Sequence, residues 1–127
     1  MHDKAKNAVV LIIAGIGSDP GASNILCKFG SDKLDRIDEI HIIYGSSWSG
    51  LTFTFAVGNI LNEATDSAPV LEKGKFIKVS PFSRIEDTAF RHPVGRQRPC
   101  IIRHSKLATI PRFIKDVKTV TNHDSWK

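Results

Sequence analysis

The sequence contains few of the residues that stabilise small secreted domains. It has only two cysteines, Cys27 and Cys100, which lie far apart and form no metal or redox pattern. Cysteines of this kind are by default buried free thiols in a reducing compartment, so we predict a cytoplasmic protein. Like charges form no block, and a net charge of +5 favours solubility and a weak attraction to anions, and no more.

Long hydrophobic runs are absent as well. No apolar stretch approaches the roughly 18 residues of a membrane span. The apolar run over residues 8–16 follows Lys4 and Lys6, an order typical of a short signal peptide. However, the run is short, Asp3 lies in the charged region, and no A-x-A cleavage site follows. We therefore expect no secretion and no membrane partner.

Several catalytic and binding signatures are missing. There is no G-x-S-x-G and no H-E-x-x-H. Cys100 and His104 are four residues apart, a spacing that would bring both side chains to one metal ion only if they lay on a helix. Pro99 and the β-branched residues that follow it favour a strand at this place instead. We therefore predict no metal site. Basic and acidic residues are mixed without interleaved aromatics, which makes nucleic acid the least favoured partner.

The 127 residues, of which 41% are hydrophobic, are enough for one domain with its own core, and we predict a single domain over 1–127. Residues 9–13 read as a strand buried on both faces, and residues 22–29 as a helix. Further along, the pattern predicts strands over 37–44 and 51–55, a helix over 57–64, a hairpin over 69–79, an edge strand over 86–91, a short strand over 100–103, a helical turn over 107–110 and a last strand over 115–121. Together, these strands and helices predict an α+β domain with a mixed sheet, helices packed on one face, and residues 9–13 as the central strand.

A glycine-rich turn joins the first predicted strand to the first predicted helix. It is not a dinucleotide-binding G-x-G-x-x-G, because Gly15 and Gly17 fit but Pro20 stands in place of the third glycine. Proline offers no N–H and obstructs close packing of helix on strand. We therefore predict that the isolated chain binds neither NAD(H) nor NADP(H).

The same turn has two interpretations. In the first, Asp19 is the N-cap of the helix and Pro20 its first residue. In the second, the turn from Gly17 to Asn24 lines a substrate pocket, in which free N–H groups attract a carboxylate and Asp19 orients an amino group. Asn24 either reaches that pocket or lies on a solvated helix face.

Several segments, in order, resemble the saccharopine dehydrogenase family. Residues 14–26 look like its G-x-DPG-x-x-N segment, and residues 37–45 like the strand that follows it. Residues 68–82 resemble its "PAPV…GKW…VPPF" hairpin, and residues 93–95 and 109–114 its "P-x-G" and "TLPRYI" segments. The resemblance covers most of the chain but includes no Rossmann domain.

The resemblance implies a substrate-binding domain of an NAD(P)-dependent oxidoreductase that acts on the C–N bond of an amino acid, in lysine or related amino-acid metabolism. It also implies that residues 1–8 are the end of a preceding Rossmann helix, and that Arg112 lies in a family motif. Arginine pairs bidentately with carboxylates, so Arg96 and Arg112 are candidate ligands of an amino-dicarboxylic substrate, although most arginines are surface charges.

The candidate substrate-binding residues are therefore Gly17, Ser18, Asp19, Gly21, Asn24, Arg96 and Arg112, with no catalytic residue assigned. The alternative function is a non-catalytic truncated remnant or dimerising module. A homodimer, or pairing with a separate Rossmann domain, would cover exposed apolar residues such as Trp48, Leu51, Phe53 and Phe55.

Overall fold

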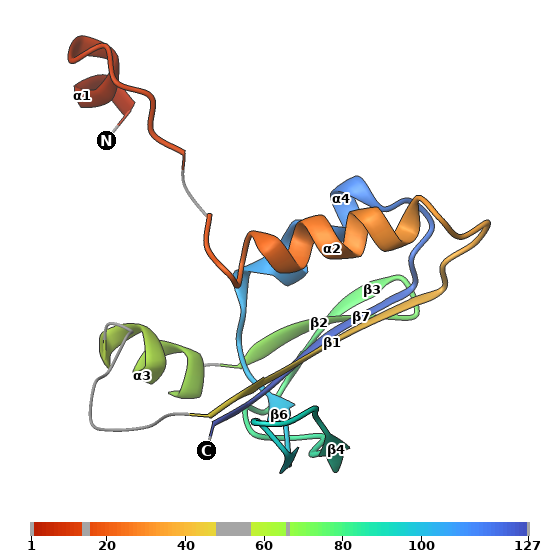
Figure 1. Ribbon diagram of the computed structural model, residues 1–127. Helices are drawn as coiled ribbons and strands as arrows, with labels where there is room; N and C mark the ends of the chain where they lie inside the picture. The colour runs from red at the N-terminus through yellow and green to blue at the C-terminus, as the bar shows by residue number, and fades with distance from the viewer. Residues whose placement is uncertain (1, 14–15, 48–56, 66, 127) are drawn as a thin grey trace.

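A computed structural model describes residues 2–13, 16–47, 57–65 and 67–126 of the chain (Figure 1). The helices of this part are α1 (His2–Asn7), α2 (Ala22–Ser31), α3 (Val57–Thr65), the 3₁₀ helix η1 (Ser105–Ala108) and α4 (Ile110–Phe113). Its strands are β1 (Glu39–Ser46), β2 (Ala68–Glu72), β3 (Lys75–Val79), β4 (Thr88–Ala89), β5 (Arg96–Gln97), β6 (Cys100–Ile101) and β7 (Thr119–Trp126). No helix in these ranges is long and apolar enough to cross a membrane.

The main sheet is mixed, and β7 lies at its centre. The strand order is β1-β7-β2-β3, and β6 also pairs with β7. β7 runs parallel to β1 from Glu39↔Thr119 to Ser46↔Trp126, and antiparallel to β2 and β6. β4 and β5 form a separate two-stranded sheet. The predicted α+β class with a mixed sheet is confirmed.

Alternate residues of β7 face opposite sides of the sheet, as the pleat requires. Val120 belongs to the hydrophobic core, whereas the side chain of Thr121 forms a hydrogen bond with His41 on β1. α2, η1 and α4 lie over one side of the sheet, away from β4 (Figure 1). β6 is a strand of the main sheet itself, because it pairs with β7. Helices therefore cover one face of the sheet.

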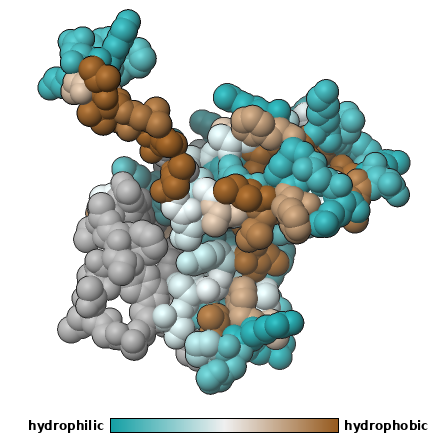
Figure 2. Space-filling model, turned by 45° about the horizontal axis from the view of Figure 1, so that its top comes forward, coloured by the Kyte–Doolittle hydropathy of each residue, from teal (hydrophilic) through white to brown (hydrophobic). Residues whose placement is uncertain are grey.

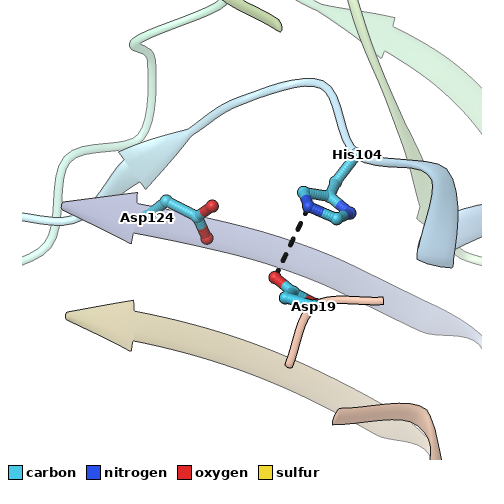
Figure 3. Close-up of side chains that lie close together, drawn as sticks. All are labelled: Asp19, His104 and Asp124. Atoms are coloured by element: carbon cyan, nitrogen blue, oxygen red, sulfur yellow. Dashed lines mark ion pairs between the residues drawn. The ribbon is translucent and has the colours of Figure 1, made fainter. Parts of the chain in front are cut away.

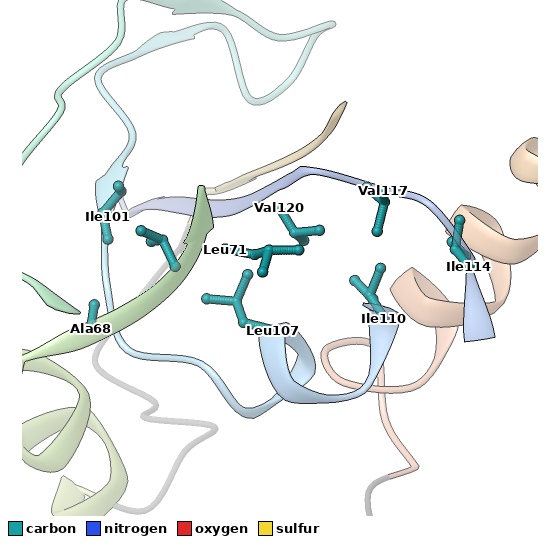
Figure 4. Packing of buried hydrophobic residues seen from close by; sticks show 9 residues of the cluster. Ala68, Leu71, Ile101, Leu107, Ile110, Ile114, Val117 and Val120 are labelled. Atoms are coloured by element: carbon teal, nitrogen blue, oxygen red, sulfur yellow. The ribbon is translucent and has the colours of Figure 1, made fainter. Parts of the chain in front are cut away.

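The core lies between the sheet and η1–α4. Leu107 and Ile110 point from these helices toward Leu71 and Val120 (Figure 4). Its buried members are Ala68, Val70, Leu71, Ile101, Leu107, Ile110, Ile114, Val117 and Val120. Burying a side chain of this size stabilises the fold by about 1.5–3 kcal/mol.

The prediction of a central strand over residues 9–13 is wrong. These residues, called here the N-terminal arm, form no strand, and Val9 and Leu11 are 93% and 83% exposed. In Figure 2 the arm is an apolar stalk that leads away from the body to α1. No described strand pairs with the arm, and the central position that was predicted for it is held by β7, between β1 and β2.

Other predictions fall close to the observed elements. The hairpin is confirmed as β2 and β3, and the helices over 22–29 and 57–64 as α2 and α3. The edge strand over 86–91 is only the two residues of β4, and the last strand begins at Thr119 rather than at residue 115. Residues 51–55 and Trp48 lie outside the described residues.

Candidate functional site

A tight turn formed by residues 17–21 begins the candidate site. Gly17 and Gly21 form a β-bridge, and the N–H of Ala22 donates to the Gly17 carbonyl at 2.9 Å. Gly21 has φ 134°, and a Cβ there would lie 2.3 Å from the Gly17 oxygen. No side chain fits at that position, so this glycine is required for the turn. Ser18 contributes its carbonyl, which accepts from the N–H of Ser23 at 3.2 Å.

Asp19 is not the N-cap of α2, contrary to the first interpretation of the turn. Gly21 holds that position and makes no side-chain cap, and Pro20 precedes the helix rather than beginning it. The Asp19 carboxylate instead accepts a hydrogen bond from Ser23 Oγ at 2.7 Å and forms an ion pair with Lys106 Nζ. The attraction of a buried ammonium group accounts for this inward orientation.

Four charged or titratable side chains meet at this point. Lys106 is fully buried, and the side chains of Asp19 and His104 are each 9% exposed. His104 Nε2 lies 3.5 Å from Asp19 Oδ2. Asp124 projects from β7 toward the same space, and each of Asp19, His104 and Asp124 offers a ligand atom within 4.8 Å of the others (Figure 3). We call Asp19, His104, Lys106 and Asp124 the charged cluster.

Burial shifts the titration of two cluster members. It raises the pKa of Asp124 to about 6, an effect that Lys106 opposes and Asp19 reinforces. It lowers the pKa of His104, against the pull of the Asp19 carboxylate. His104 is therefore held in its neutral form at pH 7.

The charges of Asp19 and Lys106 also affect the pKa values of two neighbouring residues, Glu63 and Cys27. The pKa of Glu63 on α3 is raised by burial and by Asp19, and lowered by Lys106. The pKa of the Cys27 thiol is raised, chiefly by burial. Glu63 and Cys27 are thus electrostatic neighbours of the charged cluster.

Two buried polar atoms beside the cluster have no hydrogen-bond partner among the described residues. They are Nδ1 of His104 and Oδ1 of Asn122. The Asn122 amide nitrogen already donates to Asp124 Oδ1 at 3.0 Å. Buried polar atoms are rarely left unpaired, so both atoms are suited to bind a buried water molecule.

The donor set of two carboxylates and one imidazole is chemically suited to a divalent metal. Lys106, however, already places an ammonium group against Asp19. A divalent cation beside that ammonium would be repelled, since both are buried. We therefore treat these residues as a charge and proton network rather than a metal centre.

An open groove of about 820 Å³ lies beside the charged cluster, and His104 lines it. A volume of this size is typical of small-molecule sites. The other lining residues come from α3, from the β2–β3 hairpin and from the segment between β6 and α4: Asn62, Glu63, Pro69, Phe76, Ile77, Lys78, Arg103, Ser105 and Ala108.

Among the predicted site residues, those of the turn lie together and the rest do not. Asn24 donates through Nδ2 to Thr109 Oγ1 at 2.8 Å, which ties α2 to the start of α4. Arg96 is exposed on β5, where it pairs with Asp87 at 2.7 Å. β5 pairs with β4, which lies on the opposite side of the main sheet from α2 (Figure 1). Arg112 is exposed on α4.

Sequence reasoning missed Lys106, Asp124 and Glu63, and considered His104 only as a metal ligand. Asp19 and Lys106 are separated by 87 residues, so no local spacing could reveal their contact. One usable signal is the period-2 pattern Val120, Asn122, Asp124, which places two polar side chains on the same face as a core residue.

Comparison with known proteins supports the fold. No family model matches the sequence. The structure is similar to apo histidine-tagged saccharopine dehydrogenase (L-Glu forming) from Saccharomyces cerevisiae, with a TM-score of 0.59 and 18% identity over 86% of this chain. The chain spans only 28% of that protein. At this identity the likeness shows a relationship of fold and no more.

Proposed function

We propose that this chain is the substrate-binding domain of an NAD(P)-dependent oxidoreductase acting on the C–N bond of an amino acid, with the cofactor held by a separate Rossmann domain. The observation that carries the proposal is the buried charged cluster beside an open groove, in a fold similar to part of saccharopine dehydrogenase. The absence of G-x-G-x-x-G from the sequence is the reason for placing the cofactor elsewhere.

Oxidation of a C–N bond to an imine removes a hydride from carbon and a proton from nitrogen. A bound nicotinamide supplies the hydride acceptor. His104 is suited to take the proton, since it is neutral and lines the groove. If Nε2–H faces Asp19, the lone pair is on Nδ1, a buried atom without a partner, so a water molecule would carry the proton to it from the groove. Asp19 would then stabilise the imidazolium, and Lys106 would hold Asp19 in place.

The proposal can be tested by titrating the ¹⁵N-labelled chain with L-glutamate, L-lysine and NADH. We expect the amino acids to shift amide signals of the 17–21 turn and of His104, and NADH to shift none. His104→Gln should reduce the changes that the amino acids cause in the amide signals, and the variant's spectrum should remain that of a folded protein. Micromolar NADH binding, or no response to any amino acid, would contradict the proposal.

The second candidate is a non-catalytic remnant or dimerising module, and exposed apolar side chains favour it. Val9 and Leu11 of the arm, and Ile25 and Phe29 of α2, are each at least 62% exposed. Contact with a second copy, or with a separate Rossmann domain, would cover such residues. Light scattering showing a monomer at high concentration would count against self-association. The two free thiols fit a cytoplasmic location for either candidate.

A further inference from the structure

The N-terminal arm is an apolar segment without a partner strand among the described residues. Its residues, 9–13, carry no charge, and each side chain is at least 50% exposed. All but Leu11 are Val or Ile, the residue types that favour strands. The arm leads away from the sheet of its own chain (Figure 1, Figure 2). It therefore has the composition of a strand, and its own sheet does not use it.

The start of the arm is strained. Beyond the end of α1, the N–H of Val10 donates to the Ala5 carbonyl at 3.0 Å. The N–H of Val9 donates to the Lys6 carbonyl at 3.2 Å. In this type of helix end, the residue after the last turn is usually glycine, because its backbone must be left-handed. Val9 holds that place with φ 52°, which is rare for a β-branched residue. Extending Val9 into a strand would relieve this strain.

Strand β3 has a free edge that matches the arm in length. It ends the order β1-β7-β2-β3, and its five residues pair only with β2 among the described strands. The tight loop before β3 has positive φ at both of its residues, so Lys75 is the hydrogen-bonded partner of Glu72. By alternation, Ile77 also bonds to β2. The N–H and C=O groups of Phe76 and Lys78 therefore point away from β2, toward the free edge.

The side chains of β3 suit an apolar, uncharged strand. Phe76 and Ile77 are 58% and 39% exposed. The strand at the other end of the order, β1, exposes mostly polar side chains: Glu39, His41 and Tyr44. Pairing of β3 with another β3 would bring the lysines of both, Lys75 and Lys78, to one shared edge, where like charges repel. The arm has no charge to be repelled.

We propose that the arm of one copy adds as a strand to the free edge of β3 in a second copy, and that the two copies exchange arms. Both halves of the contact lie in one chain, so a reciprocal exchange closes as a two-fold dimer. The arm then lies beside Phe76, Ile77 and Lys78, which line the groove, so each copy forms part of the rim of its partner's groove. This inference rests on the second candidate above, self-association, and names its contact. It does not depend on the oxidoreductase activity.

The test is amide hydrogen exchange of the whole ¹⁵N-labelled chain over a series of concentrations, with the mass followed by light scattering. We expect a dimer, in which the amides of Phe76 and Lys78 exchange more slowly than in the monomer. The amide of Ile77 is the internal control, because its bond to β2 protects it at every concentration. A monomer throughout, or a dimer in which Phe76 and Lys78 exchange as in the monomer, would overturn the proposal.

Two proline variants test the arm itself. Leu11→Pro and Ile12→Pro remove the N–H from neighbouring positions, only one of which faces β3. At least one of them should raise the dissociation constant of the dimer by about tenfold, the scale of one lost hydrogen bond. Neither should change the fold of the monomer, because the arm is exposed and unpaired there.

The matched control is Phe29→Ser. Phe29 is 62% exposed on α2, so this variant also removes an exposed apolar side chain, but outside the proposed contact. It should leave the dissociation constant unchanged. If neither proline variant weakens the dimer, the contact between the arm and β3 is refuted. If Phe29→Ser alone weakens it, self-association is real but takes place through α2.

Discussion

The N-terminal arm and strand β7 show opposite relations between polarity and burial. The arm is entirely apolar, yet its five side chains are each at least 50% exposed. From Thr121 to Ser125, β7 carries only polar side chains, and all five are buried. The difference follows from pairing: β7 has strand neighbours on both sides, whereas no described strand pairs with the arm. Burial in a sheet is set by the position of a strand as much as by its hydropathy.

The polar residues of β7 remain buried because most of them have partners. His41 Nδ1 lies 2.8 Å from Thr121 Oγ1, Asn122 donates to Asp124, and Ser125 Oγ donates to the Gln97 side chain. The Asp124 carboxylate also lies in the field of the Lys106 ammonium group. A buried strand built this way is stable only while its charges remain compensated.

The sharpest way to break this compensation is Lys106→Met. It removes the buried cation that pairs with Asp19 and opposes the raised pKa of Asp124, so we expect a loss of about 3–5 kcal/mol in the free energy of unfolding, measured with urea. Lys118→Met is the control, because Lys118 pairs with Asp38 on the exposed surface and its loss should change stability little. The double variant Asp19→Asn/Lys106→Met should recover part of the loss. Equal stability of both single variants would rule out a structural role for the buried pair.

The second prediction concerns how much the buried carboxylate of Asp124 on β7 lowers the free energy of unfolding. Its pKa is raised from 3.8 to about 6 in the fold, so the folded state binds more protons than the unfolded state between these values. Stability should therefore fall as pH rises from about 4 to about 6, by roughly 3 kcal/mol in total. Asp124→Asn should remove this dependence and be the more stable protein at pH 7.

The measurement is the difference in unfolding free energy between wild type and Asp124→Asn across pH 3–8. Taking the difference removes most of the contribution of other groups, such as His104, whose lowered pKa makes stability fall as pH drops below its unfolded value of about 6.5. A difference that stays constant with pH would show that Asp124 titrates normally.

Gly21→Ala tests the turn that places Asp19 against β7. The new Cβ would overlap the Gly17 carbonyl, and φ at this position is 134°, so we expect a loss of about 1–3 kcal/mol. Gly30 lies in α2 with no atom within 4 Å of its would-be Cβ. Gly30→Ala should stabilise the chain by about 0.5–1 kcal/mol in the same urea experiment. If both variants lose the same stability, the turn is not specific for glycine.

Local features of the fold were predictable, and contacts across it were not. The β2–β3 hairpin follows from alternation around a glycine turn, with Gly74 at φ 76°, and α2 from its apolar spacing. The central position of β7 depends on its register with β1, some eighty residues earlier in the chain. The turn at residues 17–21 was predictable as a turn because its glycines are local signals, whereas its role in binding a substrate stays a prediction. Lys106 was missed because only tertiary contacts bury it.

The smallest expected effect on stability is that of Leu11→Ala in the arm. Leu11 is 83% exposed, so its truncation should change the free energy of unfolding by no more than about 0.5 kcal/mol. The same change at Leu107, which is fully buried, should cost about 2–5 kcal/mol because it leaves a cavity in the core. The arm should matter for association instead: Leu11→Ser with Ile13→Ser should lower the apparent mass in light scattering if the arm contacts a second copy. A loss of stability at Leu11 comparable to that at Leu107 would mean that the arm is buried in solution, and the contrast with β7 would then disappear.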